Sequence, residues 1–309
     1  MSEILLLNPW ITDFAAYDLW ARPLGLLYIG ACLRRLPGVG VRLLDCLDHA
    51  RLPPGLAARV RRRADGRGHY HREIIAKPEP LRGIKRHYCR YGIPEEVFRQ
   101  CLRQLPTPDV VLVTSRMTYW YPGVQRAIAI VREELPTARV VLGGLYPTLC
   151  PRHARQFSGA DAIVSGTRLE PLLALLASWK LVPPPAPGAD HLFSVTPAWD
   201  LYDKLSSLVL LTSLGCPGRC PYCAAARLWP VYQRRAPGEV FAELRQWRTC
   251  FPGLRDVAFY DDALLLDADR HLLPFLELVG DNGGAGLRFH TPNGLHVPAA
   301  PVGRQDGQG

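Results

Sequence analysis

Three cysteines stand within one short segment of this chain, at Cys216, Cys220 and Cys223. Their spacing is C-x3-C-x2-C, and the apolar run Leu208–Thr212 in front of them has the composition of a buried strand. Three thiolates on one loop can hold three corners of an iron–sulfur cube, which usually takes four protein ligands. The fourth iron is then open to a small molecule. The spacing therefore predicts a [4Fe–4S] cluster that serves as a reaction centre.

A structural zinc site is the alternative interpretation of these cysteines. Such sites are closed by four ligands, often as two C-x2-C pairs. No second pair follows Cys223 in the sequence, so Cys250 or His191 would have to complete a zinc site from a distance. The ligand spacing favours the cluster.

The cysteine loop resembles the signature of the radical S-adenosylmethionine (SAM) enzymes, and Tyr222 stands where that family usually has an aromatic residue. The resemblance implies that the open iron chelates the amino and carboxylate groups of SAM and that Tyr222 lies near its adenine. It also implies reductive cleavage of SAM to a deoxyadenosyl radical. A reductant such as a flavodoxin or a ferredoxin is then the expected partner.

Composition and charge limit the class of protein. The chain has 309 residues, of which 48% are hydrophobic, enough for two globular domains. Nine cysteines without a secretory signal, and a first apolar run too short for a membrane span, lead us to expect a cytoplasmic protein. The net charge of +9 is concentrated between Arg51 and Arg103. Because no nucleic-acid motif is recognised, we interpret this segment as a solvated arginine-rich insertion and expect neither a nucleic-acid nor a membrane partner.

Alternating strands and helices predict an α/β fold for residues 1–180. Short apolar runs have the composition of buried parallel strands at Ile4–Leu7, Val41–Asp45, Val110–Thr114, Val140–Leu142 and Ala162–Ser165. Helical patterns lie between most of them, at Leu24–Arg35, Val124–Glu134 and Leu169–Trp179. This order predicts a flavodoxin- or Rossmann-like, doubly wound sheet, whose ligands sit at the carboxyl ends of the strands. The residues at those ends are Asn8, Thr114, Ser115, Gly143, Gly144 and Gly166.

Residues 1–180 also resemble the cobalamin-binding domain that precedes many radical SAM domains. The matching segments are residues 5–9, 23–29, 142–148 and 166–170. The resemblance implies that the residues at the strand ends lie against cobalamin. The D-x-H-x-x-G signature that supplies a histidine to cobalt is absent from the sequence, as it is from many relatives, because Asp48 and His49 are adjacent. A domain that binds nothing, or only shields the radical site, is the alternative.

Two segments interrupt or follow this domain. Residues 50–105 form a long basic insertion between the second and third predicted strands. Loops of this length are usually functional or disordered, and we interpret the insertion as a lid that faces the substrate. The proline-rich segment 181–205 predicts a stiff linker.

The second domain, residues 206–296, begins like a parallel barrel. After the cysteine loop the pattern predicts a helix at Pro237–Cys250, a strand at Val257–Asp262, a helix at Ala268–Val279 and a strand at Leu287–Thr291. Chemistry in such barrels sits at the carboxyl ends of strands, here Asp261, Asp262 and Asn293. Residues 259–263 resemble the F-x-D-D variant of cobalamin-linked relatives, which implies contact between these side chains and SAM. A turn-capping role for one aspartate or for Asn293 is the alternative.

The second domain has room for only about three βα units, and by resemblance radical SAM barrels have more. Residues 297–309 have the composition of a disordered tail. We therefore expect an incomplete radical SAM (β/α) barrel, which is left short or is completed by a partner chain. The predicted function is cobalamin-linked radical methylation or rearrangement of an unreactive carbon. The alternatives are a catalytically inactive protein that binds cluster or corrin, and a zinc-stabilised interaction module.

Overall fold

The computed structural model describes residues 1–185 and 195–295. The chain divides into two compact units, the first comprising residues 1–207 with 250–254 and the second comprising residues 208–249 with those from 255 onward. No helix within the described ranges is long and apolar enough to cross a membrane.

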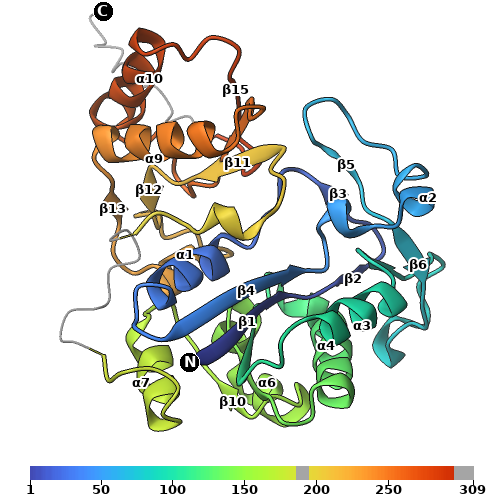
Figure 1. Ribbon diagram of the computed structural model, residues 1–309. Helices are drawn as coiled ribbons and strands as arrows, with labels where there is room; N and C mark the ends of the chain where they lie inside the picture. The colour runs from blue at the N-terminus through green and yellow to red at the C-terminus, as the bar shows by residue number, and fades with distance from the viewer. Residues whose placement is uncertain (186–194, 296–309) are drawn as a thin grey trace, which may run out of the picture. The chain divides into compact units, whose positions relative to one another are not determined.

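A five-stranded parallel sheet forms the centre of the first unit (Figure 1). Its strands are β1 (Ser2–Asn8), β4 (Val39–Asp45), β8 (Val110–Val113), β9 (Arg139–Leu142) and β10 (Ala162–Ile163). They lie in the order β10-β9-β8-β1-β4, and all neighbouring pairs are parallel. This is the strand order of a flavodoxin-like sheet. The predicted α/β fold of the first domain is confirmed.

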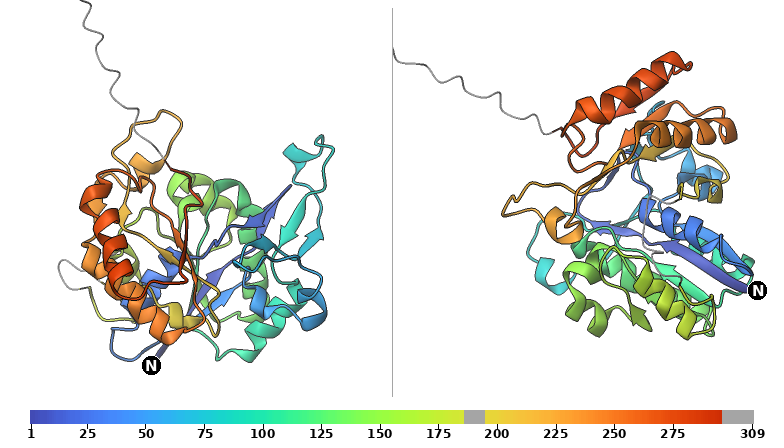
Figure 2. Two further views of the ribbon diagram at one scale, coloured as in Figure 1. Left: turned by 90° about the horizontal axis from the view of Figure 1, so that it is seen from above. Right: turned by 90° about the vertical axis from the view of Figure 1, so that its left-hand side faces the viewer.

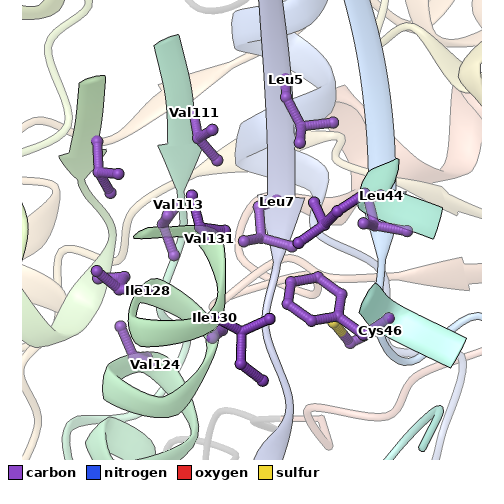
Figure 3. Close-up of a cluster of buried hydrophobic side chains, with 14 of the residues drawn as sticks. Leu5, Leu7, Leu44, Cys46, Val111, Val113, Val124, Ile128, Ile130 and Val131 are labelled. Atoms are coloured by element: carbon purple, nitrogen blue, oxygen red, sulfur yellow. The ribbon is translucent and has the colours of Figure 1, made fainter. Parts of the chain in front are cut away.

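Helices cover both faces of this sheet, with α1 on one face and α3, α4 and α6 on the other in Figure 1. The helices are α1 (Leu24–Leu33), α3 (Glu95–Gln104), α4 (Tyr121–Glu134), α5 (Leu145–Leu149), α6 (Pro151–Phe157) and α7 (Glu170–Ser178). Side chains two residues apart on a strand share a face. Leu5, Leu7, Val111 and Val113 therefore pack together against α4, as Figure 3 shows.

The basic insertion is folded, and it pairs with the residues that follow β1. Strand β7 (Cys89–Tyr91) lies between β2 (Ile11–Asp13) and β6 (Arg72–Ile74) in an antiparallel sheet, and β5 (Gly68–His69) pairs with β3 (Tyr17–Asp18). The remaining short elements near these strands are η1 (His49–Arg51), α2 (Pro54–Ala57), η2 (Glu79–Leu81) and η3 (Thr118–Trp120). Figures 1 and 2 place the antiparallel strands beyond the carboxyl ends of β1 and β4. The last part of segment 50–105 is α3, the crossover helix between β4 and β8.

Part of the predicted linker belongs to the first unit, while its residues 186–194 lie outside the described residues. The turn η5 (Trp199–Leu201) buries Trp199 completely. The backbone N–H of Ala198 donates to the Leu27 carbonyl over 3.1 Å. Residues 195–207 are therefore packed structure.

The second unit contains a three-stranded sheet in the order β11-β14-β15. Its strands are β11 (Ser207–Leu210), β14 (Asp256–Phe259) and β15 (Arg288–His290), and its principal helices are α9 (Pro237–Cys250) and α10 (Leu272–Asp281), with the short turn η6 (Ala268–Arg270) before α10. Helix α9 has the predicted bounds, and Figure 2 shows it beside α10. The predicted succession of strands and helices is confirmed. An incomplete barrel stays a prediction, and residues 297–309 lie outside the described part.

Candidate functional site

The cysteine loop is closed at its base by a short antiparallel ladder. Strand β12 (Ser213–Leu214) pairs with β13 (Gln233–Arg234), so the loop leaves and rejoins the unit at neighbouring points. Gly215 begins the loop with φ +79°. A Cβ at this position would lie 2.9 Å from Cβ of Trp229, so the turn requires glycine. Within the loop, α8 (Ala225–Leu228) directly follows the third cysteine.

The thiols of Cys216, Cys220 and Cys223 are unpaired and accessible: Cys216 is half-buried, and the other two are exposed. The backbone N–H of Gly218 donates to Sγ of Cys216, and that of Ala225 donates to Sγ of Cys223, each over 3.4 Å. A Cβ on Gly218 would lie 3.2 Å from Sγ of Cys216 and 3.9 Å from Sγ of Cys220, so glycine keeps the space between two donors open.

These donors fit a three-cysteine cluster site in type, spacing and access. Across residues 1–185 and 195–295, no three His, Cys, Asp or Glu side chains are already gathered around one metal position. The loop would therefore have to draw its thiols together when it binds a metal. Tyr222 lies in the same loop and is 89% exposed. The pKa of the Tyr222 hydroxyl is raised, first by a hydrogen bond with Cys220 and then by the charge of Cys220.

Asp261 fixes the base of the cysteine loop. The side chain is only 3% exposed, and its Oδ1 accepts hydrogen bonds from the backbone N–H and hydroxyl groups of both Thr212 and Ser213, over 2.6–3.0 Å. Thr212 lies between β11 and β12, and Ser213 is the first residue of β12, the strand that leads into the loop. In the described structure Asp261 is thus a positioning residue whose Oδ1 is fully used.

Asp262 and Asn293 are the exposed polar side chains at this edge of the sheet. Desolvation, and after it the charge of Asp261, raise the pKa of Asp262. The Asn293 carboxamide donates to the Tyr260 carbonyl over 3.1 Å, and the Tyr260 N–H donates to the Leu210 carbonyl over 3.0 Å. These two bonds join the ends of β11, β14 and β15, the same edge of the sheet from which the chain continues into the cysteine loop.

A buried ion pair supports the other side of the loop. Arg235 and Glu243 are 5% and 1% exposed, and their charged atoms are 2.7 Å apart. Arg235 also donates to the Leu211 carbonyl from its side chain and to the Thr212 carbonyl from its backbone. Burial raises the pKa of Glu243, and the Arg235 charge opposes that shift. This pair was not predicted from the sequence. The only local indication was a charged residue directly after β13 and another inside helix α9.

In the first unit, Asn8 faces into the protein at the end of β1. Its side-chain amide donates to Oδ1 of Asp45 over 2.6 Å, and the Tyr202 hydroxyl donates to Oδ2 of Asp45 over 2.6 Å. All three residues are buried. Burial, followed by the charge of Asp45, raises the pKa of Tyr202, which keeps the phenol a donor. Asp45 and Tyr202 were not predicted, because their contact joins positions far apart in the sequence.

Ser115 and Gly144 bind the ends of β8 and β9 to each other. The Ser115 hydroxyl accepts from the Tyr146 N–H over 3.0 Å, and the Ser115 carbonyl accepts from the Leu145 N–H over 2.8 Å. Gly144 has φ +93°, and a Cβ there would lie 2.4 Å from the Ser115 carbonyl oxygen and 3.0 Å from Oγ1 of Thr114. Only glycine allows this approach of the two chains.

Gly143 and Gly166 leave the same edge of the sheet open. A Cβ on Gly143 would have one neighbour, the Val164 carbonyl oxygen at 3.8 Å, and a Cβ on Gly166 would have none within 4 Å. Thr148 joins the two turns, since its hydroxyl donates to the Gly144 carbonyl and accepts from the Gly166 N–H. Among the predicted strand-end residues, Asn8, Ser115 and Gly144 are therefore used in internal contacts, Gly143 and Gly166 border open space, and Thr114 is half-buried.

Comparison with known proteins agrees with this architecture. Residues 79–176 match the family model of the B12 binding domain, a span that contains the ends of β8, β9 and β10. A search of curated proteins found no match. Among solved structures, the fold is similar to that of the cobalamin-dependent S-adenosylmethionine radical enzyme OxsB, determined with aqua-cobalamin and S-adenosylmethionine bound. The TM-score is 0.57 at 12% identity, over 94% of this chain and 38% of that one.

The chain thus spans well under half of the OxsB chain. The family match supports the first unit, and the structural match supports the fold of nearly the whole chain. The resemblance inferred from the sequence is confirmed at this level: the chain contains a match to the B12 binding domain, and its fold is similar to that of a cobalamin-dependent radical SAM enzyme.

Proposed function

We propose that this chain is a radical SAM enzyme that works with cobalamin. Cys216, Cys220 and Cys223 ligate a [4Fe–4S] cluster, and SAM lies against Tyr222, Asp262 and Asn293. When bound, such a cluster delivers one electron to the SAM sulfonium, which breaks the C5′–S bond and gives methionine and a 5′-deoxyadenosyl radical. The reaction we propose is radical methylation or rearrangement of an unreactive carbon.

One observation carries the proposal: a three-cysteine loop leaves the end of a sheet strand, and the same chain matches a B12 binding domain. Asp261, Arg235 and Glu243 hold the base of that loop and leave its thiols accessible. Asp262 can accept a hydrogen bond from the SAM ammonium or ribose. The Asn293 carboxamide donates one N–H to the Tyr260 carbonyl, and its side-chain oxygen can accept a hydrogen bond from a ligand.

The first unit holds cobalamin at the open edge formed by Thr114, Gly143 and Gly166. Small residues there let a large flat ligand approach the backbone. Thr114 supplies a hydroxyl to the corrin side chains. A reductant of the flavodoxin or ferredoxin type supplies the electron, and a partner chain that completes the barrel is part of the same proposal.

Anaerobic reconstitution with iron and sulfide tests the cluster. We expect about four irons per chain, a brown colour, and an electron paramagnetic resonance signal of the reduced protein that changes when SAM is added. Single alanine variants of Cys216, Cys220 and Cys223 should lose the iron. Cys250→Ala is the matched control, because its thiol is also exposed but lies outside the loop. Iron loading that survives in the loop variants, or zinc in place of iron, contradicts the proposal.

Release of 5′-deoxyadenosine separates the enzyme from an inactive binding protein. With dithionite as electron source, the reconstituted protein should cleave SAM, and the loop variants should not. A protein with a full cluster that never releases 5′-deoxyadenosine is the inactive alternative.

Cobalamin binding is tested at Gly143. Gly143 does not have a positive φ and borders open space, so the fold should tolerate leucine at this position. The leucine side chain would occupy the space proposed for the corrin and should displace it. We expect Gly143→Leu to lose visible cobalamin absorbance after gel filtration. Gly25→Leu is the control, because it fills open space on the surface of α1 in the same unit. Equal retention of cobalamin by both variants contradicts this edge as the binding site.

A further inference from the structure

The insertion of the first unit forms a basic groove. Three adjoining pockets of about 470, 880 and 630 Å³ share lining residues, since the first two have Phe14 and Arg86 in common and the last two have Tyr17 and Arg61 in common. The basic residues that line them are Arg59, Arg61, Arg62, Arg63, Arg67, Arg72, Lys77, Lys85 and Arg86, with His69, His71 and His87. None of the described lining residues is acidic.

Arg61, Arg62 and Arg63 stand on a hairpin that backbone hydrogen bonds close. The backbone N–H of His69 donates to the Arg61 carbonyl and that of Arg63 to the Arg67 carbonyl, over 2.9 and 2.7 Å. A Cβ on Gly68 would lie 2.7 Å from the Arg61 carbonyl oxygen, so glycine permits this close pairing. Side-chain nitrogen of Arg62 meets Oδ2 of the buried Asp18 at 2.7 Å and anchors the hairpin.

Other basic residues of the groove are exposed and are not paired with a carboxylate in the part of the chain that the structure describes. Arg59, Arg61 and Arg63 are exposed, as are Lys85 and Arg86. Within the described ranges, no carboxylate lies within 4.0 Å of any of these five cations. Exposed cations without acidic partners attract a polyanion, because their charge is not neutralised within the protein.

Aromatic rings alternate with these cations. Tyr17 is 39% exposed, and its ring meets His69 edge to face at 5.0 Å. Phe14 lies 5.9 Å under the Arg86 guanidinium. Cations that follow a backbone, together with rings on which bases stack, are the two components of sites for single-stranded nucleic acid. An acidic peptide or an anionic membrane would use the cations without the rings.

We propose that the groove between Phe14, Tyr17 and the Arg61–Arg63 hairpin binds a single-stranded nucleic acid. The proposal goes beyond the cluster and cobalamin chemistry and lies within the first unit. It is therefore testable whether or not the cysteine loop is loaded.

The test is fluorescence anisotropy of the full chain with labelled oligothymidylate and oligouridylate of about 12 nucleotides. Log Kd should depend linearly on log salt, with a slope of about 0.7 for each phosphate contact, or about 3.5 for five cations. The variant Arg61→Ala/Arg63→Ala/Arg86→Ala should bind at least about tenfold more weakly and lose about two units of that slope. Arg152→Ala/Arg155→Ala, which removes exposed arginines from α6, is the control and should bind like the unmodified chain.

Tyr17 distinguishes a nucleic acid from other anions. Tyr17→Ala should weaken oligonucleotide binding by about tenfold, while Tyr17→Phe keeps the ring and should bind normally. Poly-glutamate of similar length and vesicles with anionic lipid are the competing probes. The proposal is overturned if either competes as well as the oligonucleotide, if Tyr17→Ala has no effect, or if the triple variant and its control bind alike. Circular dichroism of each variant verifies that the fold is retained.

Discussion

We predict that the Asp261 carboxylate is required to keep the backbone of Thr212 and Ser213, at the base of the cysteine loop, in its ordered conformation. The perturbation is Asp261→Ala, which removes the acceptor of four hydrogen bonds at a position that is only 3% exposed. The hydroxyl groups of Thr212 and Ser213 can rotate toward other acceptors, but their backbone N–H groups cannot. An unsatisfied buried donor costs about 2 kcal/mol, so the two N–H groups together should cost about 4 kcal/mol.

Hydrogen exchange of the Thr212 and Ser213 amides measures this cost where it arises. A loss of about 4 kcal/mol corresponds to roughly a thousandfold faster exchange when these amides exchange through local opening. Asp261→Asn keeps an acceptor oxygen, so we expect a loss of only about 1 kcal/mol and a correspondingly smaller effect. Asp269→Ala serves as the matched control, because it removes an exposed carboxylate from the same unit.

The same variants connect the base of the loop with its function. Asp261→Ala should also lower iron loading, since a loop with a frayed base has to be ordered before it binds metal. If the Thr212 and Ser213 amides of Asp261→Ala exchange within about threefold of their original rate, the assignment of Asp261 as a positioning residue is wrong.

Three further predictions concern other contacts within the two units. Arg235→Ala should destabilise the second unit by about 4 kcal/mol because it leaves the Glu243 charge buried, and an Arg235→Met/Glu243→Leu double variant should recover most of that loss in urea unfolding. Gly144→Ala should cost about 3 kcal/mol through its positive φ and its close neighbours, whereas Gly143→Ala should stay within about 1 kcal/mol, as thermal unfolding can verify. The pKa of Glu95 is lowered to about 2, first by its hydrogen bond with Arg126, so its contribution to stability is present above about pH 4.5 and is lost as the pH falls toward 2. In Glu95→Gln, the stability measured by fluorescence-monitored unfolding should fall less steeply over this acidic pH range. An unchanged pH dependence would refute the prediction.

The regular elements were predictable because local pattern determines them. Residues 4–7 and 110–113 are continuous apolar runs, which suit strands that are covered on both faces. The helix at Pro237–Cys250 begins with proline at a position that needs no backbone donor, and its predicted bounds are correct.

The internal contacts were not predictable, because they join residues distant in sequence. Asp261 meets Thr212 and Ser213 across 49 and 48 positions, and no local pattern encodes that pairing. The insertion was interpreted as a solvated, arginine-rich segment, and the pairing of its strands with residues 11–18, which lie before it in the chain, was not predicted. The C-x3-C-x2-C spacing was enough to select the three cysteines as candidate ligands. Which polar residues at the strand ends remain accessible depends on tertiary contacts, which the sequence does not show.

The ladder between β12 and β13 gives the cysteine loop mechanical independence. Because its two ends are joined beside each other, the segment can change shape without displacing the strands from which it emerges. In protein that lacks metal, proteases should therefore cut within residues 216–232 before they cut the strands and helices described for this unit. If the loop binds the proposed cluster, the cluster can then be assembled after the rest of the unit has folded.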